Sequence, residues 1–217
     1  MHIKPETNRT IRNKNIPAKP YIFEDETRGY IQSVEYNRPV TLKKALYDIK
    51  QSSQIDEGVA GDKPIVQRFI DDLNISGKIL NKKIVKMLGS GSSAIAFETP
   101  DGKIIKITDG NHFPLNRPHA VFDVPVYKKG HKGKTYYYIE EKLYQHAMPV
   151  FWVDSVRDMI RDKGYRPFDL YEYDTHQIGI SKNGQIYLLD PECARYKTVF
   201  HAMFDKTIRL MKKIKFV

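Results

Sequence analysis

Two glycines and one lysine are the residues of this chain whose types and spacing are best suited to chemistry. Gly89 and Gly91 stand in a polar turn between two apolar stretches, and Lys106 follows inside the apolar run Ile104–Ile107. Glycine lets backbone N–H groups approach an anion without a Cβ in the way. A lysine on a neighbouring strand adds a positive charge that suits phosphate. The pattern predicts a site for the phosphates of a nucleotide.

Strands are expected on both sides of this turn, because apolar residues alternate there with a period of two. A Pro-Asp-Gly turn at Pro100–Gly102 separates two of them, and the glycine-containing turn Lys129–Lys134 separates two others. The alternation predicts about five antiparallel strands, over residues 79–88, 94–97, 103–107, 124–128 and 135–143.

Helices are expected before and after these strands, where apolar residues recur at helical spacing. Thr41 is a predicted N-cap of the first helix, Asp62 of the second, and Pro64 suits the second helix's first turn. A short hairpin around Lys182–Gly184 is expected over 178–181 and 185–189. The predicted helices cover residues 41–51, 62–77, 149–163 and 198–215.

The amino-acid composition favours a folded protein without disulfide bonds or membrane-spanning segments. Of the 217 residues, 41% are hydrophobic, so a packed core is expected, and the formal net charge of +10 favours anionic partners. The single cysteine excludes an intrachain disulfide and a cysteine-based metal site. No apolar run approaches the roughly 18 residues of a membrane span, and the N-terminus lacks the apolar segment of a Sec signal peptide. We therefore expect a cytoplasmic protein, of the producing cell or of a host cell.

The first 22 residues or so are basic and contain several prolines. They carry five lysines and arginines against one acid, Glu6. We interpret this segment as an extended, solvated arm. An anchor on a partner protein or on nucleic acid is the alternative, and nucleic acid is the less favoured of the two partners.

Four stretches resemble, in the same order along the chain, motifs of the protein-kinase superfamily. Residues 89–96 (GSGSSAIA) are similar to the glycine-rich loop G-x-G-x-x-G-x-V, with Ala94 in place of the third glycine. Residues 104–106 resemble the V-A-I-K strand, and residues 185–191 resemble the strand that ends in the D-F-G aspartate. Residues 174–177 resemble a shortened D-x-H-x-x-N catalytic loop of small bacterial or phage kinase-like proteins.

This resemblance spans roughly residues 80–215 and implies an α+β, two-lobed, minimal protein-kinase-like fold. Residues 1–77 would form an N-terminal helical extension, made of the basic arm and two helices. Residues 78–217 would form the kinase-like domain. Its antiparallel, β-rich small lobe would cover about 78–143, and a reduced helical lobe would cover about 144–217.

The resemblance also implies ATP and Mg²⁺ as cofactors and assigns roles to individual residues. Lys106 would pair with the α- and β-phosphates, and Asp174 would orient the acceptor hydroxyl. Asp190 would hold Mg²⁺, and the amide oxygen of Gln177 would reach a second ion. The backbone of Tyr138–Glu141 would meet the adenine edge. The remaining nucleotide-binding positions would be Gly89, Ser90, Gly91, Ser92, Ala94, Glu140 and Glu141.

The catalytic-loop motif departs from the kinase pattern. In kinases the catalytic aspartate precedes the D-F-G aspartate by a usual spacing, and here that spacing from Asp190 leads to Glu172. Asp174 requires a shorter loop, and Asp169, the third candidate, requires a longer one. Gln177 is one methylene longer than the usual asparagine. The chain after Asp190 is also too short for an activation segment, so regulation by phosphorylation there is not expected.

Protein kinases place a helix after the lysine strand, and a glutamate on this helix orients the lysine. Here residues 109–122 are rich in proline and histidine and contain no glutamate. Two alternatives follow. Asp109 or Asp123 supplies the acid from a loop, or the helix before the glycine-rich turn supplies it through Asp71 or Asp72, and the second is our hypothesis.

The resemblance predicts an active minimal protein kinase that phosphorylates a protein hydroxyl, serine or threonine rather than tyrosine. The first alternative is a pseudokinase or ATP-binding interaction module without turnover. The others are a small-molecule kinase of the aminoglycoside or choline type and a basic nucleic-acid-binding or structural protein.

Overall fold

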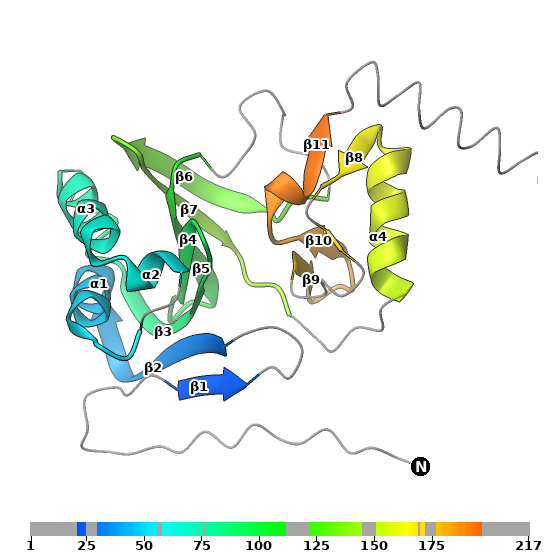
Figure 1. Cartoon of the computed structure of the whole chain (residues 1–217). Helices are drawn as coiled ribbons and strands as arrows, with labels where there is room; N and C mark the ends of the chain where they lie inside the picture. Colours follow the sequence, from blue (N-terminus) through cyan, green and yellow to red (C-terminus); the bar gives the residue numbers. More distant parts are fainter. Residues whose placement is uncertain are drawn as a thin grey trace, which may run out of the picture. The chain divides into compact units, whose positions relative to one another are not determined.

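The computed structural model describes residues 21–24, 30–55, 58–75, 77–111, 122–144, 151–168, 170–171 and 177–196. The chain forms two compact units (Figure 1). The first contains Met1–Asp109 and His131–Tyr137, and the second contains Gly110–Gly130 and Tyr138–Val217. Most of the basic arm and the predicted helix over 198–215 lie outside the described residues.

An antiparallel sheet with few helices is the main feature of the fold, so the expected α+β class is confirmed. Six strands follow one another across the sheet, and the four-residue β1 is added at one edge (Figure 1). The last two strands contain residues of both units. The spatial order is β1 (Tyr21–Glu24), β2 (Tyr30–Thr41), β3 (Lys83–Ser90), β4 (Ala94–Glu98), β5 (Lys103–Asp109), β7 (Thr135–Glu141) and β6 (Val126–Lys132).

The long strand β2 was not expected from the sequence. It pairs with β3 through Val34↔Met87 and Val40↔Ile84, with a register shift between Glu35 and Val40. The polar break Asn37–Pro39 falls within this irregular stretch, and proline is tolerated in a strand at such a bulge. The residues before position 77 therefore contribute a strand to the sheet that carries the glycine-rich turn.

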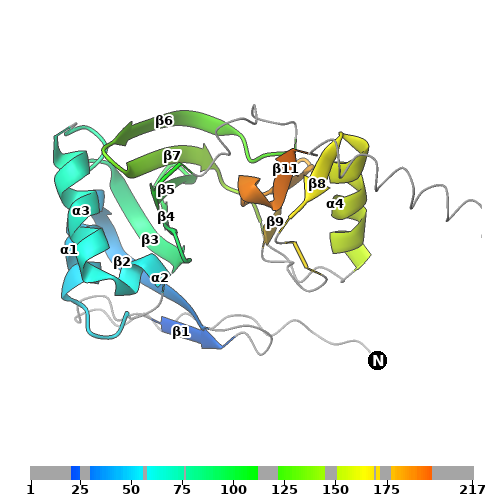
Figure 2. The ribbon, with the colours of Figure 1, turned by 45° about the horizontal axis from the view of Figure 1, so that its top comes forward.

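Among its described residues, the first unit contains three helices: α1 (Leu42–Gln51), α2 (Gly58–Gly61) and α3 (Lys63–Asn74). Both predicted caps are confirmed, because Thr41 Oγ1 accepts from the Lys44 amide at 3.2 Å and Asp62 Oδ1 accepts from the Ile65 amide at 3.1 Å. The helix α2 lies where only a loop was expected. Helices α1 and α3 lie side by side (Figure 2).

The strand register separates an apolar face of the sheet from a polar one. Val34, Met87, Phe97 and Ile105 form one row across four strands, and all four are buried. The next row, on the opposite face, contains Glu35, Lys86, Glu98 and Ile104. Residues directly opposite one another in paired strands share a face, so the register alone determines which side chains can meet.

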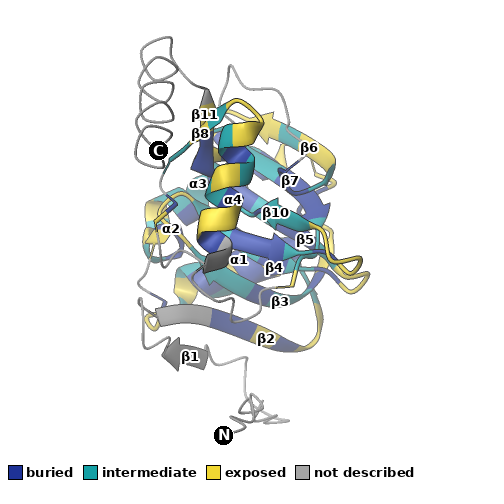
Figure 3. Ribbon diagram, turned by 90° about the vertical axis from the view of Figure 1, so that its right-hand side faces the viewer, coloured by how far each residue is buried: buried dark blue, intermediate teal, exposed yellow. Residues whose placement is uncertain are grey.

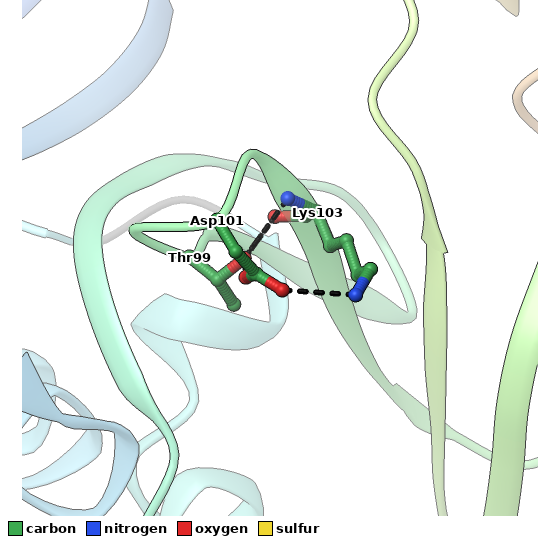
Figure 4. A network of polar contacts seen from close by, with 3 residues as sticks. All are labelled: Thr99, Asp101 and Lys103. Carbon is green, nitrogen blue, oxygen red and sulfur yellow. Dashed lines mark hydrogen bonds and ion pairs between the residues drawn. The ribbon is translucent and has the colours of Figure 1, made fainter.

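The turn between β4 and β5 is held by a small polar network (Figure 4). The buried Thr99 donates its hydroxyl to Asp101 Oδ1 at 2.6 Å, and the Lys103 amide donates to Thr99 Oγ1 at 2.9 Å. Lys103 Nζ lies 2.9 Å from Asp101 Oδ2. The hydrogen bond from Thr99 and the contact with Lys103 lower the pKa of Asp101 from 3.8 to about 2.

We expect the replacement Asp101→Asn to reduce stability near neutral pH and to have no effect in strong acid. A carboxylate whose pKa is lower in the folded state stabilises that state above its ordinary pKa, and the contribution disappears as the pH falls toward the folded value. The difference in free energy of unfolding should therefore fade between about pH 4 and about pH 2. It should stay below about 1 kcal/mol because the side chain is 61% exposed. Urea unfolding of the wild type and of Asp101→Asn across this pH range measures the difference in free energy of unfolding. A difference that does not change with pH would contradict the lowered pKa of Asp101.

The second unit contains one α-helix and short strands among its described residues. Helix α4 (Phe151–Asp162) buries Val153, Val156 and Ile160 and leaves its opposite side exposed (Figure 3). Gly164, with φ of 87°, follows its end. The strands β9 (Ile178–Ile180) and β10 (Ile186–Leu188) form the predicted hairpin, and β8 (Tyr165–Pro167) pairs with β11 (Ala194–Tyr196).

The expectation of a helical second lobe is therefore wrong for the described residues, because the elements after α4 are four short strands and one 3₁₀ turn. The physical reason is the pairing of β8 with β11. These strands lie on either side of the β9–β10 hairpin in the sequence, so neither has a local partner that would reveal it. None of the helices among the described residues has the length and apolar character that a membrane span requires.

Candidate nucleotide-binding site

The glycine-rich turn connects β3 to β4 and is closed by its own backbone. The Gly91 amide donates to the Ala94 carbonyl at 2.8 Å, and the Ser93 carbonyl accepts from the Asp109 amide at 2.8 Å. The three residues at the tip, Gly91, Ser92 and Ser93, are exposed. Within the described part of the chain, the amides of Ser92 and Ser93 donate no hydrogen bond. The tip thus presents two backbone donors, which is what an anion requires.

Lys106 lies in a row that starts at this turn. Gly89 is opposite Ala96 in the β3–β4 pair, and Ala96 is opposite Lys106 in the β4–β5 pair. The three residues therefore share one face of the sheet. The first two residues of this row have the smallest side chains, and the lysine at its end is half-buried. The structure brings the predicted lysine and the predicted turn together.

Three acids considered as partners of Lys106 have other partners in the structure. Asp72 Oδ2 accepts from the buried Thr135 hydroxyl at 2.6 Å, and Asp71 Oδ1 accepts from the side-chain amide nitrogen of Gln67 at 2.7 Å. Asp109 Oδ1 lies 2.5 Å from an Arg68 guanidinium nitrogen. The fourth acid, Asp123, is buried in the second unit.

Glu98 is an acid on the face of Lys106 that sequence reasoning missed. It lies two residues from Ala96 along β4, so it is the diagonal neighbour of Lys106, within reach of two long side chains. The signal was present in the alternation of β4. The kinase pattern points to acids on a helix or in a loop and not to the strand that pairs with Lys106.

The second unit brings Gln177 close to Asp190. The Leu189 amide donates to the Gln177 carbonyl at 2.8 Å, just before Asp190, and the β9–β10 hairpin joins the two positions. Asp190 Oδ1 accepts from the Glu192 amide at 2.8 Å and so caps the 3₁₀ turn Pro191–Cys193. The catalytic candidates Asp174, Glu172 and Asp169 lie outside the described residues.

The oxygen donors of this pair are compatible with Mg²⁺. Magnesium prefers hard oxygen ligands and is commonly bound by one or two protein groups, with phosphates and waters completing its shell. A carboxylate at Asp190 and an amide oxygen at Gln177 fit that requirement. Among the described residues, no group of three or more His, Cys, Asp or Glu side chains is arranged to hold a metal ion by itself.

The predicted adenine-binding positions lie at the end of β7. Glu140 is buried, with 3% of its surface exposed, and Glu141 is half-buried. The Glu141 amide donates to the Pro125 carbonyl at 3.0 Å, and the Tyr144 and Ile180 backbones exchange two hydrogen bonds, at 2.8 and 2.9 Å. This connecting segment is therefore held by backbone contacts within the second unit.

Comparison with known proteins gave no match: no family model, no curated protein and no solved structure is significantly similar to this chain. The resemblance to kinases rests on the sequence motifs alone. The turn and Lys106 belong to the first unit, and Glu140, Glu141, Gln177 and Asp190 belong to the second.

Proposed function

We propose that this protein is an ATP- and Mg²⁺-dependent phosphotransferase, a minimal protein kinase that modifies serine or threonine. The observation that carries the proposal is the row Gly89–Ala96–Lys106 beside a turn tip with two exposed amides. Such an arrangement suits a polyphosphate, because the turn between β3 and β4 supplies backbone donors and the next strand, β5, supplies a cationic side chain.

In the proposed reaction, Lys106 binds the α- and β-phosphates while the turn covers them. The substrate hydroxyl oxygen attacks the γ-phosphorus, and the bond from this phosphorus to the β–γ bridging oxygen breaks, which releases ADP. The hydroxyl proton passes to the Asp174 carboxylate. Magnesium, when bound, neutralises the negative charge of the phosphates, and Asp190 and Gln177 are the residues that would hold it.

A pseudokinase is the second candidate, and one observation favours it. Asp190 caps the turn that follows it, so a structural role alone accounts for an aspartate before Pro191. In that case the protein binds ATP and uses the fold to hold a protein partner. A small-molecule kinase shares the nucleotide site and differs only in its acceptor.

The test is incubation of the purified full chain with γ-labelled ATP and Mg²⁺, alone, with a mixture of host proteins and with aminoglycosides or choline. Label on protein serine or threonine supports the proposal, and label on the small molecules supports the small-molecule kinase. ATP binding without transfer supports the pseudokinase. No thermal shift at millimolar ATP contradicts all three.

A further inference from the structure

The short helix α2 rests on the glycine-rich turn. The Val59 amide donates to the Gly91 carbonyl at 2.9 Å, and the Ala60 amide donates to Ser90 Oγ at 3.0 Å. Contacts of α2 with β3 and β4 accompany these bonds (Figure 1). Two consecutive amides of the segment between β2 and β3 thus donate to two consecutive residues of the turn.

Gly58 makes this close approach possible. Its φ is +55°, and a Cβ at this position would lie 2.3 Å from the Gly91 carbonyl oxygen and 2.8 Å from the Gly91 carbonyl carbon. Both atoms belong to the backbone, so no side-chain rotation relieves the overlap. Only glycine fits between α2 and the turn as they are placed.

Lys63 anchors α2 from the other side. Its ammonium donates to three backbone carbonyls, those of Ile49 at 3.1 Å, Ile55 at 2.7 Å and Ala60 at 3.3 Å. One cation therefore ties the end of α1, the following loop and α2 together. Val59 and Ala60 are also buried, which adds apolar packing to the anchor.

The hydrogen bond from the Val59 amide to the Gly91 carbonyl fixes the orientation of the peptide plane between Gly91 and Ser92. In a trans peptide the C=O and the next residue's N–H point in opposite directions. Because the Gly91 carbonyl points at α2, the Ser92 amide must point away from α2, and it is one of the two exposed donors at the tip. The bond from Val59 therefore presets a donor that the proposed phosphate site requires.

We propose that residues 58–63 form a clamp that holds the glycine-rich turn ready to bind phosphate, and that Gly58 is a positioning residue for nucleotide affinity. The inference rests on the proposed function for its consequence in ATP binding. The clamp itself is a property of the free protein and is testable without nucleotide. A donor that is already oriented binds its ligand without the entropic cost of ordering the turn first.

The experiment compares Gly58→Ala with Gly77→Ala in the full chain. Gly77 is a matched control because its φ is +60° and a Cβ there meets nothing within 4 Å, so only the backbone strain is shared. Hydrogen–deuterium exchange of the peptide containing residues 86–96, measured without nucleotide, should be faster in Gly58→Ala than in the wild type and unchanged in Gly77→Ala. The dissociation constant for ATP should rise about tenfold or more in Gly58→Ala, since misplacement of a binding group by about 1 Å is costly.

Unchanged exchange of the turn in a folded Gly58→Ala protein would overturn the clamp. Faster exchange with an unchanged ATP affinity would also overturn its role in positioning. If the wild type itself binds no ATP, the proposed function fails while the exchange measurement still decides whether the clamp exists.

If Gly58→Ala does not fold, Lys63→Met provides the same measurement from the other side. It keeps an apolar side chain and removes the donor to three carbonyls. We expect faster exchange of the turn and a rise of about threefold or more in the ATP dissociation constant, because the site is less preorganised. No change in either quantity would overturn the proposal.

Discussion

Replacing Lys106 with methionine is expected to lower the rate of phosphoryl transfer by about 10²–10³-fold, because the site loses the positive charge that pairs with the phosphates. Methionine keeps most of the apolar stem that a half-buried lysine packs against the sheet. The free energy of unfolding should therefore change little. Label transfer from γ-labelled ATP and the ATP dissociation constant measure the effect, and urea unfolding checks the fold.

Lys103→Met is the matched control for this variant. Lys103 lies on the same strand, three residues away, and strand side chains at odd spacing point to opposite faces. Its ammonium pairs with Asp101 at 2.9 Å in an exposed turn. We expect transfer and ATP binding close to those of the wild type. If Lys106→Met behaves like Lys103→Met, Lys106 does not bind the nucleotide and the proposed site is wrong.

The second large effect is expected from Asp190→Asn, which separates the two roles of this residue. Asparagine is as good an N-cap as aspartate, so the hydrogen bond from the Glu192 amide and the stability of the turn should be kept. The negative charge that suits Mg²⁺ is lost. Transfer should fall about 10²–10³-fold, and the increase of ATP affinity on adding Mg²⁺ should disappear. Affinity for ATP without the metal should not fall.

Asp62→Asn is the control for this second variant, since Asp62 caps α3 in the same way and is exposed. It should leave both transfer and the Mg²⁺ effect unchanged. If Asp190→Asn also leaves them unchanged while unfolding at the wild-type denaturant concentration, the aspartate is only a cap. This comparison also works if the protein is a pseudokinase. The effect of Mg²⁺ on the ATP affinity of the wild type can be measured even when no phosphoryl transfer occurs.

The helix caps and the hairpins were predictable because their bonds are local. Thr41 and Asp62 each bind an amide three residues ahead, and Gly184 completes the tight turn between β9 and β10 with a φ of 82°. The alternation of β4 likewise follows from one buried and one half-buried face. In each case the partners lie within a few residues, so the sequence pattern and the geometry coincide.

The strands that escaped prediction have partners far away in the chain. β2 is interrupted by a polar, proline-containing break, and the structure accommodates it as an irregularity opposite β3. β8 and β11 are three residues each and exist only as a pair. Strands this short carry almost no periodic signal, and their backbone bonds depend on the rest of the unit being folded.

By itself, the sequence determined that a glycine-rich turn is followed by a strand bearing a lysine, because residue types and alternation are local properties. Only the tertiary structure decided what surrounds that pair. It paired Asp72 with Thr135 and Asp109 with Arg68, and it set Gly58 against the Gly91 carbonyl. These contacts join segments that are distant in sequence, and their geometry arises from sheet register and helix packing, which no local pattern encodes.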